Sequence, residues 1–333
     1  MRSLDWADGA IELVDQTQLP QRTEILRIDQ VPDLVAAIKR LSVRGAPAIG
    51  VAGAYGVALA AVNHPPAGDR AGFEAAVAAL RAARPTAVNL ARMVDRVAAV
   101  AVVDPAAALA EAHAIRDEEL AASVAMGESG ADLVQSLVSD PGAVRAMTIC
   151  NTGGLATVER GTALAVIQTL HERGALAEAL PLETRPLLQG GRLTTWELQE
   201  MGAPHRLLVD SAGPFLLARG AADVVLIGAD RVAANGDTAN KIGSFSLALG
   251  AAHAGVPFIV VAPESTVDGA TGTGDEIEIE DRGSAEVATV REVPVAPTGT
   301  PGVNPAFDVT PVDHITALVT DQRVVRFDRG ERL

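Results

Sequence analysis

Residues 224–243 read VVLIGADRVAANGDTANKIG, an uncharged run that is followed at once by a polar segment. Short runs of Val, Ile and Leu are typical of parallel strands that are covered on both faces. In such sheets ligands bind at the carboxyl ends of the strands, which is where this run places Asp230. Lys241, one of two lysines in the chain, follows shortly after. The stretch therefore predicts a buried strand that delivers an acid to a binding site.

The same pattern recurs through the second half of the chain. Short runs with β-branched residues occur at AMTIC (146–150), HRLLVD (205–210) and PFIVVAP (257–263), and helical patterns such as GTALAVIQTLHERG, TTWELQEMG and SFSLALGAAHAG separate them. Polar motifs follow the runs as CNTGG, DSAG, ADR and PEST. This alternation predicts an α/β fold with a mainly parallel sheet covered by helices, and with polar motifs at one edge.

The first half of the chain has a different pattern. Residues 1 to about 30 alternate apolar and polar positions and predict a small β element, whereas apolar spacing of three and four residues predicts helices from Val31 onward. Residues 104–138 suggest two further helices. The uncharged stretch 45–62 is long enough to span a bilayer, but its Ala and Gly content favours a tightly packed buried helix. We therefore predict an N-terminal domain at 1–130 and an α/β domain at 131–333.

Charge and composition exclude several classes of protein. The net charge is −15 and no Lys/Arg-rich run occurs, which argues against a nucleic-acid partner. Neither a membrane protein nor a secreted one is indicated, since the N-terminus has acids where a signal peptide is basic, and one cysteine agrees with the cytoplasm. The six histidines lack metal-ligand spacing. The glycines of 268–283 do not follow a strand, so we expect a mobile loop there, with neither metal nor nucleotide cofactor in the protein.

Cys150 is the first candidate for chemistry. A strand brings it to the sheet edge, and the polar turn CNTGG precedes a helix that starts near Thr162. Free N–H groups at a helix start bind phosphate and favour a reactive thiolate. The alternative is an inert buried cysteine, which is common in proteins.

Three further residues suggest anion or sugar binding. Arg44 precedes a long helix and Arg84 precedes another, so each guanidinium lies at a helix start, where an anion binds well. Gln189 offers both a donor and an acceptor to a sugar hydroxyl. The alternative for Arg44 is a helix cap or an ion pair with a surface carboxylate, and Arg84 gains weight only because it repeats the pattern of Arg44. The glycine pair at 190–191 brings the backbone close to a ligand or to another chain segment.

Asp230 is the strongest candidate acid. Burial at the end of an uncharged strand favours its protonated form, which suits a general acid or base. An ion pair with Arg231 is the alternative, but sequence neighbours on a strand face opposite ways. Asn235, Gly236 and Asp237 are typical turn residues.

Taken together, these segments resemble the methylthioribose-1-phosphate isomerase family, within the superfamily that also holds the regulatory subunits of an initiation factor's exchange complex. The resemblance runs through nearly the whole chain in family order. It is carried by DQTQLP (15–20), VRGAPAIGVAGAYGVALA (43–60), RPTAVNL (84–90), CNTGGLAT (150–157), GTALAVI (161–167), ETRPLLQGGRLTTWEL (183–198), GADRVAANGDTANKIGSFSLAL (228–249), PFIVVAPESTVD (257–268) and VNPAFDVTP (303–311).

The resemblance implies a helical N-terminal domain, a Rossmann-like C-terminal domain and a homodimer. It implies an aldose–ketose isomerase of methionine salvage that converts 5-methylthioribose 1-phosphate to 5-methylthioribulose 1-phosphate without metal or nucleotide. In the family the cysteine of CNTGG and the aspartate of GADR are catalytic, which correspond to Cys150 and Asp230. The substrate contacts correspond to Arg44, Gly45, Ala46, Arg84, Gln189, Asn240 and Lys241.

Two departures bear on the substrate. DSAG (210–213) stands where these isomerases typically have DNMA. Val-Glu-Arg (158–160) stands where shorter or aromatic side chains are usual. Isomerases of 5-deoxyribose 1-phosphate and ribose 1,5-bisphosphate share the scaffold and stay open as alternatives, although few lysines argue against the bisphosphate. A non-catalytic regulatory subunit is the rival from another class, and the presence of both Cys150 and Asp230 favours the enzyme. A nicotinamide-dependent dehydrogenase lacks its glycine fingerprint.

Overall fold

Residues 2–84, 88–291 and 293–333 are described by the computed structural model, in which the chain forms two units. The first unit comprises Met1–Ser123 and Gly153–Gly161, and the second comprises Val124–Thr152 and Thr162–Leu333. The domain boundary predicted at residue 130 lies within helix α5 (Ala108–Leu137).

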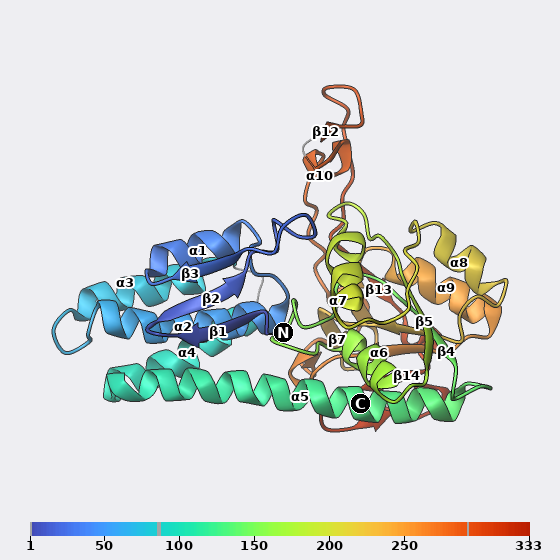
Figure 1. Ribbon diagram of the computed structural model, residues 1–333, viewed down its shortest axis with the longest axis horizontal. Helices are drawn as coiled ribbons and strands as arrows, with labels where there is room; N and C mark the ends of the chain where they lie inside the picture. The colour runs from blue at the N-terminus through green and yellow to red at the C-terminus, as the bar shows by residue number, and fades with distance from the viewer. Residues whose placement is uncertain (1, 85–87, 292) are drawn as a thin grey trace. The chain divides into compact units, whose positions relative to one another are not determined.

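The first unit has the predicted small β element and helices (Figure 1). Its antiparallel sheet has the order β1 (Leu4–Ala7), β2 (Ala10–Val14), β3 (Ile25–Ile28). The helices are α1 (Val31–Lys39), α2 (Ala46–Asn63), α3 (Arg70–Arg81), α4 (Val88–Val103) and the start of α5, which the short turn η1 (Pro105–Ala107) precedes. Among the described residues α2 is the one helix apolar and long enough to cross a membrane, and 78% of it is buried in the structure. The prediction of a tightly packed core helix is therefore confirmed.

A charged cluster in the first unit fixes strand β1. Asp5 accepts hydrogen bonds from Arg2 Nη1 at 2.6 Å, Arg116 Nη1 at 2.7 Å and Tyr55 Oη at 3.2 Å. Burial raises the pKa of Asp5, but the bonds from Arg2, Arg116 and the Trp6 N–H outweigh it and lower the pKa from 3.8 to about 2. The fold therefore favours the Asp5 carboxylate over its protonated form.

Asp5→Asn is expected to destabilise the protein at neutral pH. Because the folded pKa is the lower one, the stabilisation is complete above pH 3.8 and is lost as the pH falls toward 2. We expect a loss of about 1–2 kcal/mol at pH 7, since the side chain is partly exposed. Urea unfolding of both proteins at pH 7 and near pH 2.5 measures this. A difference between them that stays constant over that range would contradict the assignment.

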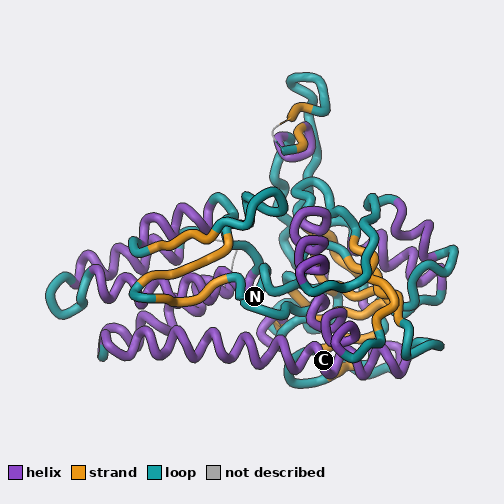
Figure 2. The backbone as a smooth tube through the Cα atoms, in the orientation of Figure 1, coloured by secondary structure: helices purple, strands orange, loops and turns teal. Residues whose placement is uncertain are grey.

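The second unit is built on a six-stranded sheet (Figure 2). Its order is β15 (Val324–Val325), β14 (Ala317–Val319), β9 (Phe258–Val261), β6 (Val224–Ile227), β4 (Val144–Thr148), β5 (Leu176–Pro181). All neighbours are parallel except β15, which pairs antiparallel with β14. The predicted α/β class is confirmed.

Helices cover this sheet. Helix α6 (Ala163–Glu172) contacts β4, β5 and β6, whereas α9 (Ser244–Ala254) packs with α8 (Ala212–Leu217) on β6 and β9. Leu247, Ala248 and Ala251 of α9 share one core with Val225 and Ile227 of β6. The turn η2 (Gly190–Thr194) and helix α7 (Thr195–Glu200) follow β5 along the chain.

Some predicted elements differ from the structure. Residues 104–138 contain one long helix, α5, instead of two, because its glycines serve close packing rather than a break. A Cβ on Gly127 would lie 2.7 Å from Thr169 Oγ1, and one on Gly130 would lie 2.4 Å from Val166 Cγ2, both on α6. The run 205–210 forms only isolated bridges, to Ala179 of β5 and to Leu182 just after it, whereas β5, β14 and β15 were not predicted as strands.

A second, four-stranded sheet includes the polar half of the stretch 224–243. Its order is β10 (Val267–Asp268), β7 (Arg231–Ala233), β8 (Thr238–Lys241), β13 (Phe307–Thr310). The predicted turn residues 235–237 connect β7 to β8. The remaining elements are η3 (Glu264–Thr266), η4 (Gly274–Glu276), α10 (Ala285–Ala288), the paired β11 (Thr289–Val290) and β12 (Val293–Pro294), η5 (Val312–His314) and η6 (Phe327–Arg329).

Candidate active site

Cys150 lies just beyond the carboxyl end of β4 and is buried, with 8% of its surface exposed. Its φ of +70° is unusual for a residue other than glycine and indicates a strained backbone held by its surroundings. The Cys150 N–H donates to Thr184 Oγ1 at 2.9 Å, and its carbonyl accepts from Thr194 Oγ1 at 2.7 Å. Gln189 Nε2 lies 3.4 Å from the Cys150 sulfur as a donor. Both backbone groups and the thiol are thus fixed by one segment.

That segment, residues 182–194, follows β5 and is itself strained and tightly packed. Thr184 and Leu188 also have positive φ values, +64° and +56°. Asp210, the acid of the DSAG motif, accepts from the Thr184 and Arg185 N–H groups at 2.7 Å each. A Cβ on Gly190 would lie 1.8 Å from the Leu182 carbonyl oxygen, so Gly190 lets the segment fold back closely on its own backbone. The Arg185 guanidinium donates hydrogen bonds to the backbone carbonyl oxygens of residues 286, 287 and 289.

Gln189 is buried beside Cys150, with 3% of its surface exposed. Its Oε1 has no hydrogen-bond partner among the described residues. A buried amide with an unused acceptor is costly, and a ligand hydroxyl would satisfy it. The structure therefore brings the predicted sugar contact into direct contact with the candidate catalytic cysteine.

Asp230 follows β6, which pairs in parallel with β4 in the central sheet. The two candidate catalytic residues therefore lie beyond the carboxyl ends of adjacent strands, and Gly228 packs against the turn after Cys150, since its added Cβ would lie 2.9 Å from Thr152 Cγ2. The expectation that Asp230 is buried is wrong: it is exposed, because the chain turns out of the buried strand at Gly228 to enter β7. Arg231 lies 3.4 Å from Asp268 in an ion pair, as a structural role requires.

Asn240 and Lys241 lie on β8, next to Asp230, whose N–H donates to the Ala239 carbonyl at 2.9 Å. Asn240 is buried and donates to Ser244 Oγ at 2.8 Å. Lys241 Nζ donates to the Ala306 carbonyl at 2.7 Å and lies 4.5 Å from the centre of the Phe307 ring. The structure thus groups five predicted residues at one edge of the second unit: Cys150, Gln189, Asp230, Asn240 and Lys241.

Asp308 was not singled out from the sequence, although it lies in the motif VNPAFDVTP. Its carboxylate accepts from the N–H groups of Gly243 at 2.7 Å and Phe245 at 3.2 Å, at the start of α9. It pairs across the strands with Asn240, and burial raises its pKa. Asp308 therefore fixes the turn that follows Lys241.

The other four predicted residues belong to the first unit. Gly45 caps α2 with φ +91°, and a Cβ there would lie 2.3 Å from the Ala156 carbonyl oxygen, so only glycine fits. Ala46 is the first residue of α2, with Arg44 just before the cap, and Pro47 lies in the first turn as predicted. Arg84 is partly exposed and precedes residues 85–87, which lie outside the described residues.

The Val-Glu-Arg departure belongs to the first unit as well. Val158 is buried in its core, and the Val158 carbonyl accepts from the Ser3 N–H at 2.7 Å. Glu159 forms an ion pair with Arg2 at 3.3 Å. Packing within the first unit accounts for these two residues.

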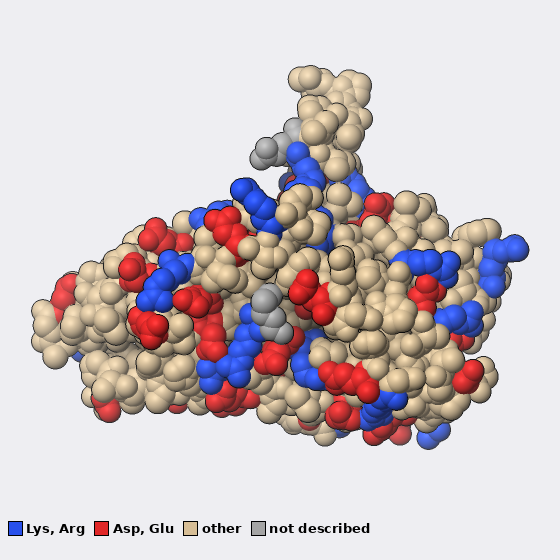
Figure 3. All heavy atoms as spheres, viewed as in Figure 1, with Lys and Arg blue, Asp and Glu red and all other residues tan. Residues whose placement is uncertain are grey.

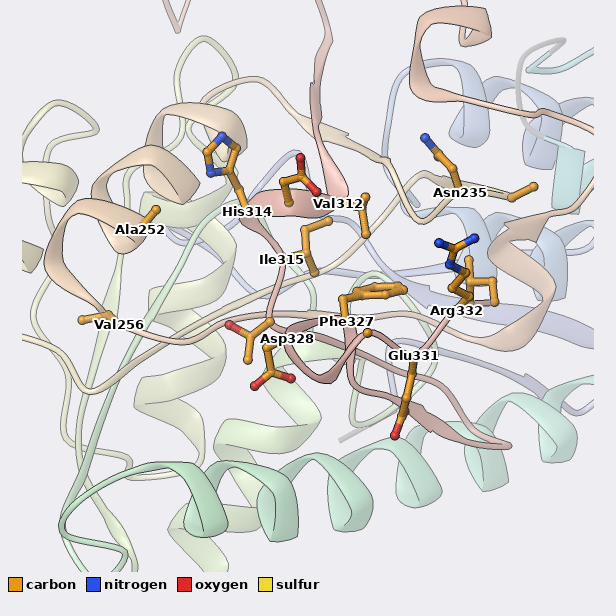
Figure 4. A pocket seen from close by; sticks show the side chains of 15 residues that line it. Asn235, Ala252, Val256, Val312, His314, Ile315, Phe327, Asp328, Glu331 and Arg332 are labelled. Atoms are coloured by element: carbon orange, nitrogen blue, oxygen red, sulfur yellow. The ribbon is translucent and has the colours of Figure 1, made fainter.

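Two of the cavities among the described residues lie in the second unit. One of about 260 Å³ is lined by Arg185, Asp210 and Gly243 among others, and so adjoins the segments that carry Thr184 and Lys241. The other, of about 690 Å³, contains none of the candidate residues and lies near the amino ends of β9 and β14. Figure 4 shows Phe327 and Ile315 in the middle of its lining, between His314 and Arg332.

Charge on the surface agrees with a locally built anion site. Acidic and basic side chains are interspersed over the face shown in Figure 3, and no broad basic patch lies among the described residues there. Within the described ranges no group of three His, Cys, Asp or Glu side chains could hold a metal ion.

Comparison with known proteins places these residues in a family. A model described as "Initiation factor 2 subunit family" matches residues 42–326. A 5-deoxyribose 1-phosphate isomerase of Moorella thermoacetica is 49% identical, over 97% of this chain and 93% of the relative. A methylthioribose-1-phosphate isomerase of Anaeromyxobacter sp. is 49% identical, over 97% and 92%.

A third relative is longer. The chain is 50% identical over 97% of its length to a probable bifunctional methylthioribose-1-phosphate isomerase/methylthioribulose-1-phosphate dehydratase of Nocardia farcinica, and spans 59% of that protein.

Two solved structures have the same fold. The 5-methylthioribose 1-phosphate isomerase of Pyrococcus horikoshii OT3 superposes with a TM-score of 0.92 at 37% identity, over 98% of this chain and 92% of that one. A structure described as translation initiation factor eIF-2B, subunit delta, from A. fulgidus gives 0.86 at 39% identity, over 98% and 96%.

Proposed function

The chain belongs to the initiation factor 2 subunit family, and we propose that within it the chain is the isomerase that converts 5-methylthioribose 1-phosphate to 5-methylthioribulose 1-phosphate in methionine salvage. One observation carries the proposal: Cys150 and Asp230 follow adjacent parallel strands at one edge of the sheet, with Gln189 against the thiol. Relatives with this name are similar over nearly the full chain.

The reaction needs an acid and a base that act in turn. In the substrate the phosphate blocks C1, so the ring opens when its oxygen receives a proton and its bond to C1 breaks. The hydrogen on C2 moves to C1, and the C2 hydroxyl loses its proton to form the ketone. Asp230 donates the first proton and recovers the last, so it ends in its starting form. Cys150 stabilises or relays the charge that develops between C1 and C2.

The remaining residues hold the substrate. Gln189 has an unused buried acceptor suited to a sugar hydroxyl, and Asn240 and Lys241 offer an amide and a cation on β8. In the first unit, Arg44 and Arg84, with the backbone at Gly45 and Ala46, are the proposed phosphate-binding groups.

The family resemblance supports a proposal for the assembly, and the single cysteine supports one for the location. We propose a homodimer that works in the cytoplasm without metal or nucleotide. Light scattering of the purified protein measures its oligomeric state. Assays with and without a chelator measure whether the activity needs a metal ion.

The substrate is tested by incubating the protein with 5-methylthioribose 1-phosphate and following the ketone carbon by NMR. We expect the reaction to proceed until the aldose and ketose phosphates reach equilibrium. Parallel reactions contain 5-deoxyribose 1-phosphate or ribose 1,5-bisphosphate, which differ only at C5. Turnover of 5-deoxyribose 1-phosphate alone would move the assignment to the activity named for the Moorella relative. Binding without turnover of any of the three would favour a regulatory subunit.

A further inference from the structure

Asn151, the residue after Cys150, contacts a buried carboxylate. It is 2% exposed, and its Nδ2 donates to Glu197 Oε1 at 2.6 Å and to Thr194 Oγ1 at 3.3 Å. Glu197 lies on α7 and is 9% exposed. The separation of 2.6 Å is short even for a charge-assisted hydrogen bond. A buried carboxylate is costly unless it is strongly bonded, so this contact has a specific use.

The contact continues to Cys150. Thr194 Oγ1, which accepts from Asn151, donates to the Cys150 carbonyl at 2.7 Å. Thr194 and Glu197 are three residues apart in the helical run formed by η2 and α7, so they lie on one face of it. This face therefore holds both the Cys150 carbonyl and the side chain of the next residue.

Cys150 needs such support because its backbone is strained. A φ of +70° costs free energy for a residue with a side chain and persists only when neighbouring contacts enforce it. Thr184 holds the N–H on one side, whereas Thr194 and Glu197 act on the carbonyl side. A relaxed turn would shift the sulfur away from Gln189.

We propose that Glu197 is a positioning residue of the isomerase site, which acts through Asn151 to hold Cys150 in its strained conformation. This inference rests on the proposed function in so far as Cys150 takes part in the reaction. Glu197 itself touches no reacting atom in this role.

The test exchanges the amide and the carboxylate between the two positions. Glu197→Ala removes the acceptor, and Asn151→Asp places two carboxylates together, which repel. The double variant Asn151→Asp/Glu197→Gln restores a donor and an acceptor in reversed order. Asp223→Asn is the matched control, because Asp223 accepts from the Arg145 N–H and guanidinium at the amino end of the same sheet.

Two quantities are measured on each full-length variant, with the melting temperature as a check of folding. The first is kcat and KM for 5-methylthioribose 1-phosphate. The second is the rate at which iodoacetamide alkylates the native protein, which reports only on Cys150 because the chain has one cysteine.

We expect both single variants to lower kcat about 10- to 100-fold, with KM changed far less. Their alkylation should be about tenfold faster, because the turn opens more often. The double variant should return kcat and the alkylation rate most of the way to their wild-type values. Asp223→Asn should lower the melting temperature and leave kcat and the alkylation rate unchanged.

Three results overturn the inference. The first is a Glu197→Ala protein with wild-type kcat and alkylation rate. The second is a double variant no better than the single ones. The third is a loss of kcat in Glu197→Ala that the Asp223→Asn control shares when both variants have the same melting temperature. If the wild-type protein turns over none of the sugar phosphates, the proposed function fails, while the alkylation rates still decide whether Glu197 positions Cys150.

Discussion

Asp230→Asn is expected to lower kcat about 10²- to 10⁴-fold while the protein remains folded. Asparagine has the same size as aspartate but can neither give a proton to the ring oxygen nor recover one from the C2 hydroxyl. The backbone bond from residue 230 to the Ala239 carbonyl is unaffected by the change. Because the side chain is exposed, its replacement leaves the core intact. Turnover measured by NMR, with circular dichroism for folding, tests this expectation.

The matched control is Asp237→Asn in the same hairpin. Its carboxylate accepts from the N–H groups of Gly274 at 3.0 Å and Val312 at 2.9 Å, so it has a structural use. This variant should melt at a lower temperature with kcat unchanged. Near-wild-type turnover in Asp230→Asn would remove the acid from that position and leave Cys150 as the main candidate.

The exposure of Asp230 also changes how its proton is supplied. Sequence reasoning expected burial by the strand itself to favour the protonated form. In the structure the chain leaves the strand at Gly228, so water reaches the carboxyl group. In the proposed mechanism the bound sugar phosphate would supply the desolvation instead, which would couple the acid strength of Asp230 to substrate binding.

The sheet and its polar edge were predictable because parallel strands give uncharged runs with motifs at one end. The runs at 146–150, 224–230 and 257–263 correspond to β4, β6 and β9. β5, which reads LAEALP, was missed because a glutamate and a proline interrupt its run. The run 205–210 has Leu207, Leu208 and Val209 in succession, yet it forms only isolated bridges to Ala179 and Leu182 at the sheet edge. Local composition does not reveal which strand has neighbours on both sides.

Contacts that depend on tertiary packing were beyond sequence reasoning. The spacing of CNTGG and LLQGG does not show that Gln189 meets Cys150, although each was a candidate by its chemistry. Asp308 and Glu197 carry no local signal, because their partners come from segments distant in sequence. The left-handed backbone of Cys150 is equally invisible, since it results from hydroxyls supplied by Thr184 and Thr194.

Cys150→Ser is the second prediction with a large effect, and we expect a loss in kcat of about 10²- to 10⁴-fold. The hydrogen bonds from Thr184 and Thr194 are made to backbone groups, so serine keeps them and the strained turn with them. What serine lacks is a large, polarisable sulfur atom over which developing charge can spread. A drop in kcat with unchanged melting temperature would therefore assign the loss to the sulfur. Near-wild-type turnover would remove Cys150 from the reaction.

Chemical modification gives an independent version of this experiment. Iodoacetamide can react with only one thiol in the chain, so inactivation at the rate of labelling reports on Cys150. Saturating 5-methylthioribose 1-phosphate should slow both labelling and inactivation, because the sugar would cover the sulfur beside Gln189. Labelling that proceeds fully without loss of turnover would contradict a catalytic thiol, even if the serine variant were inactive. Agreement of the two experiments separates the chemistry of the sulfur from the shape of the turn that holds it.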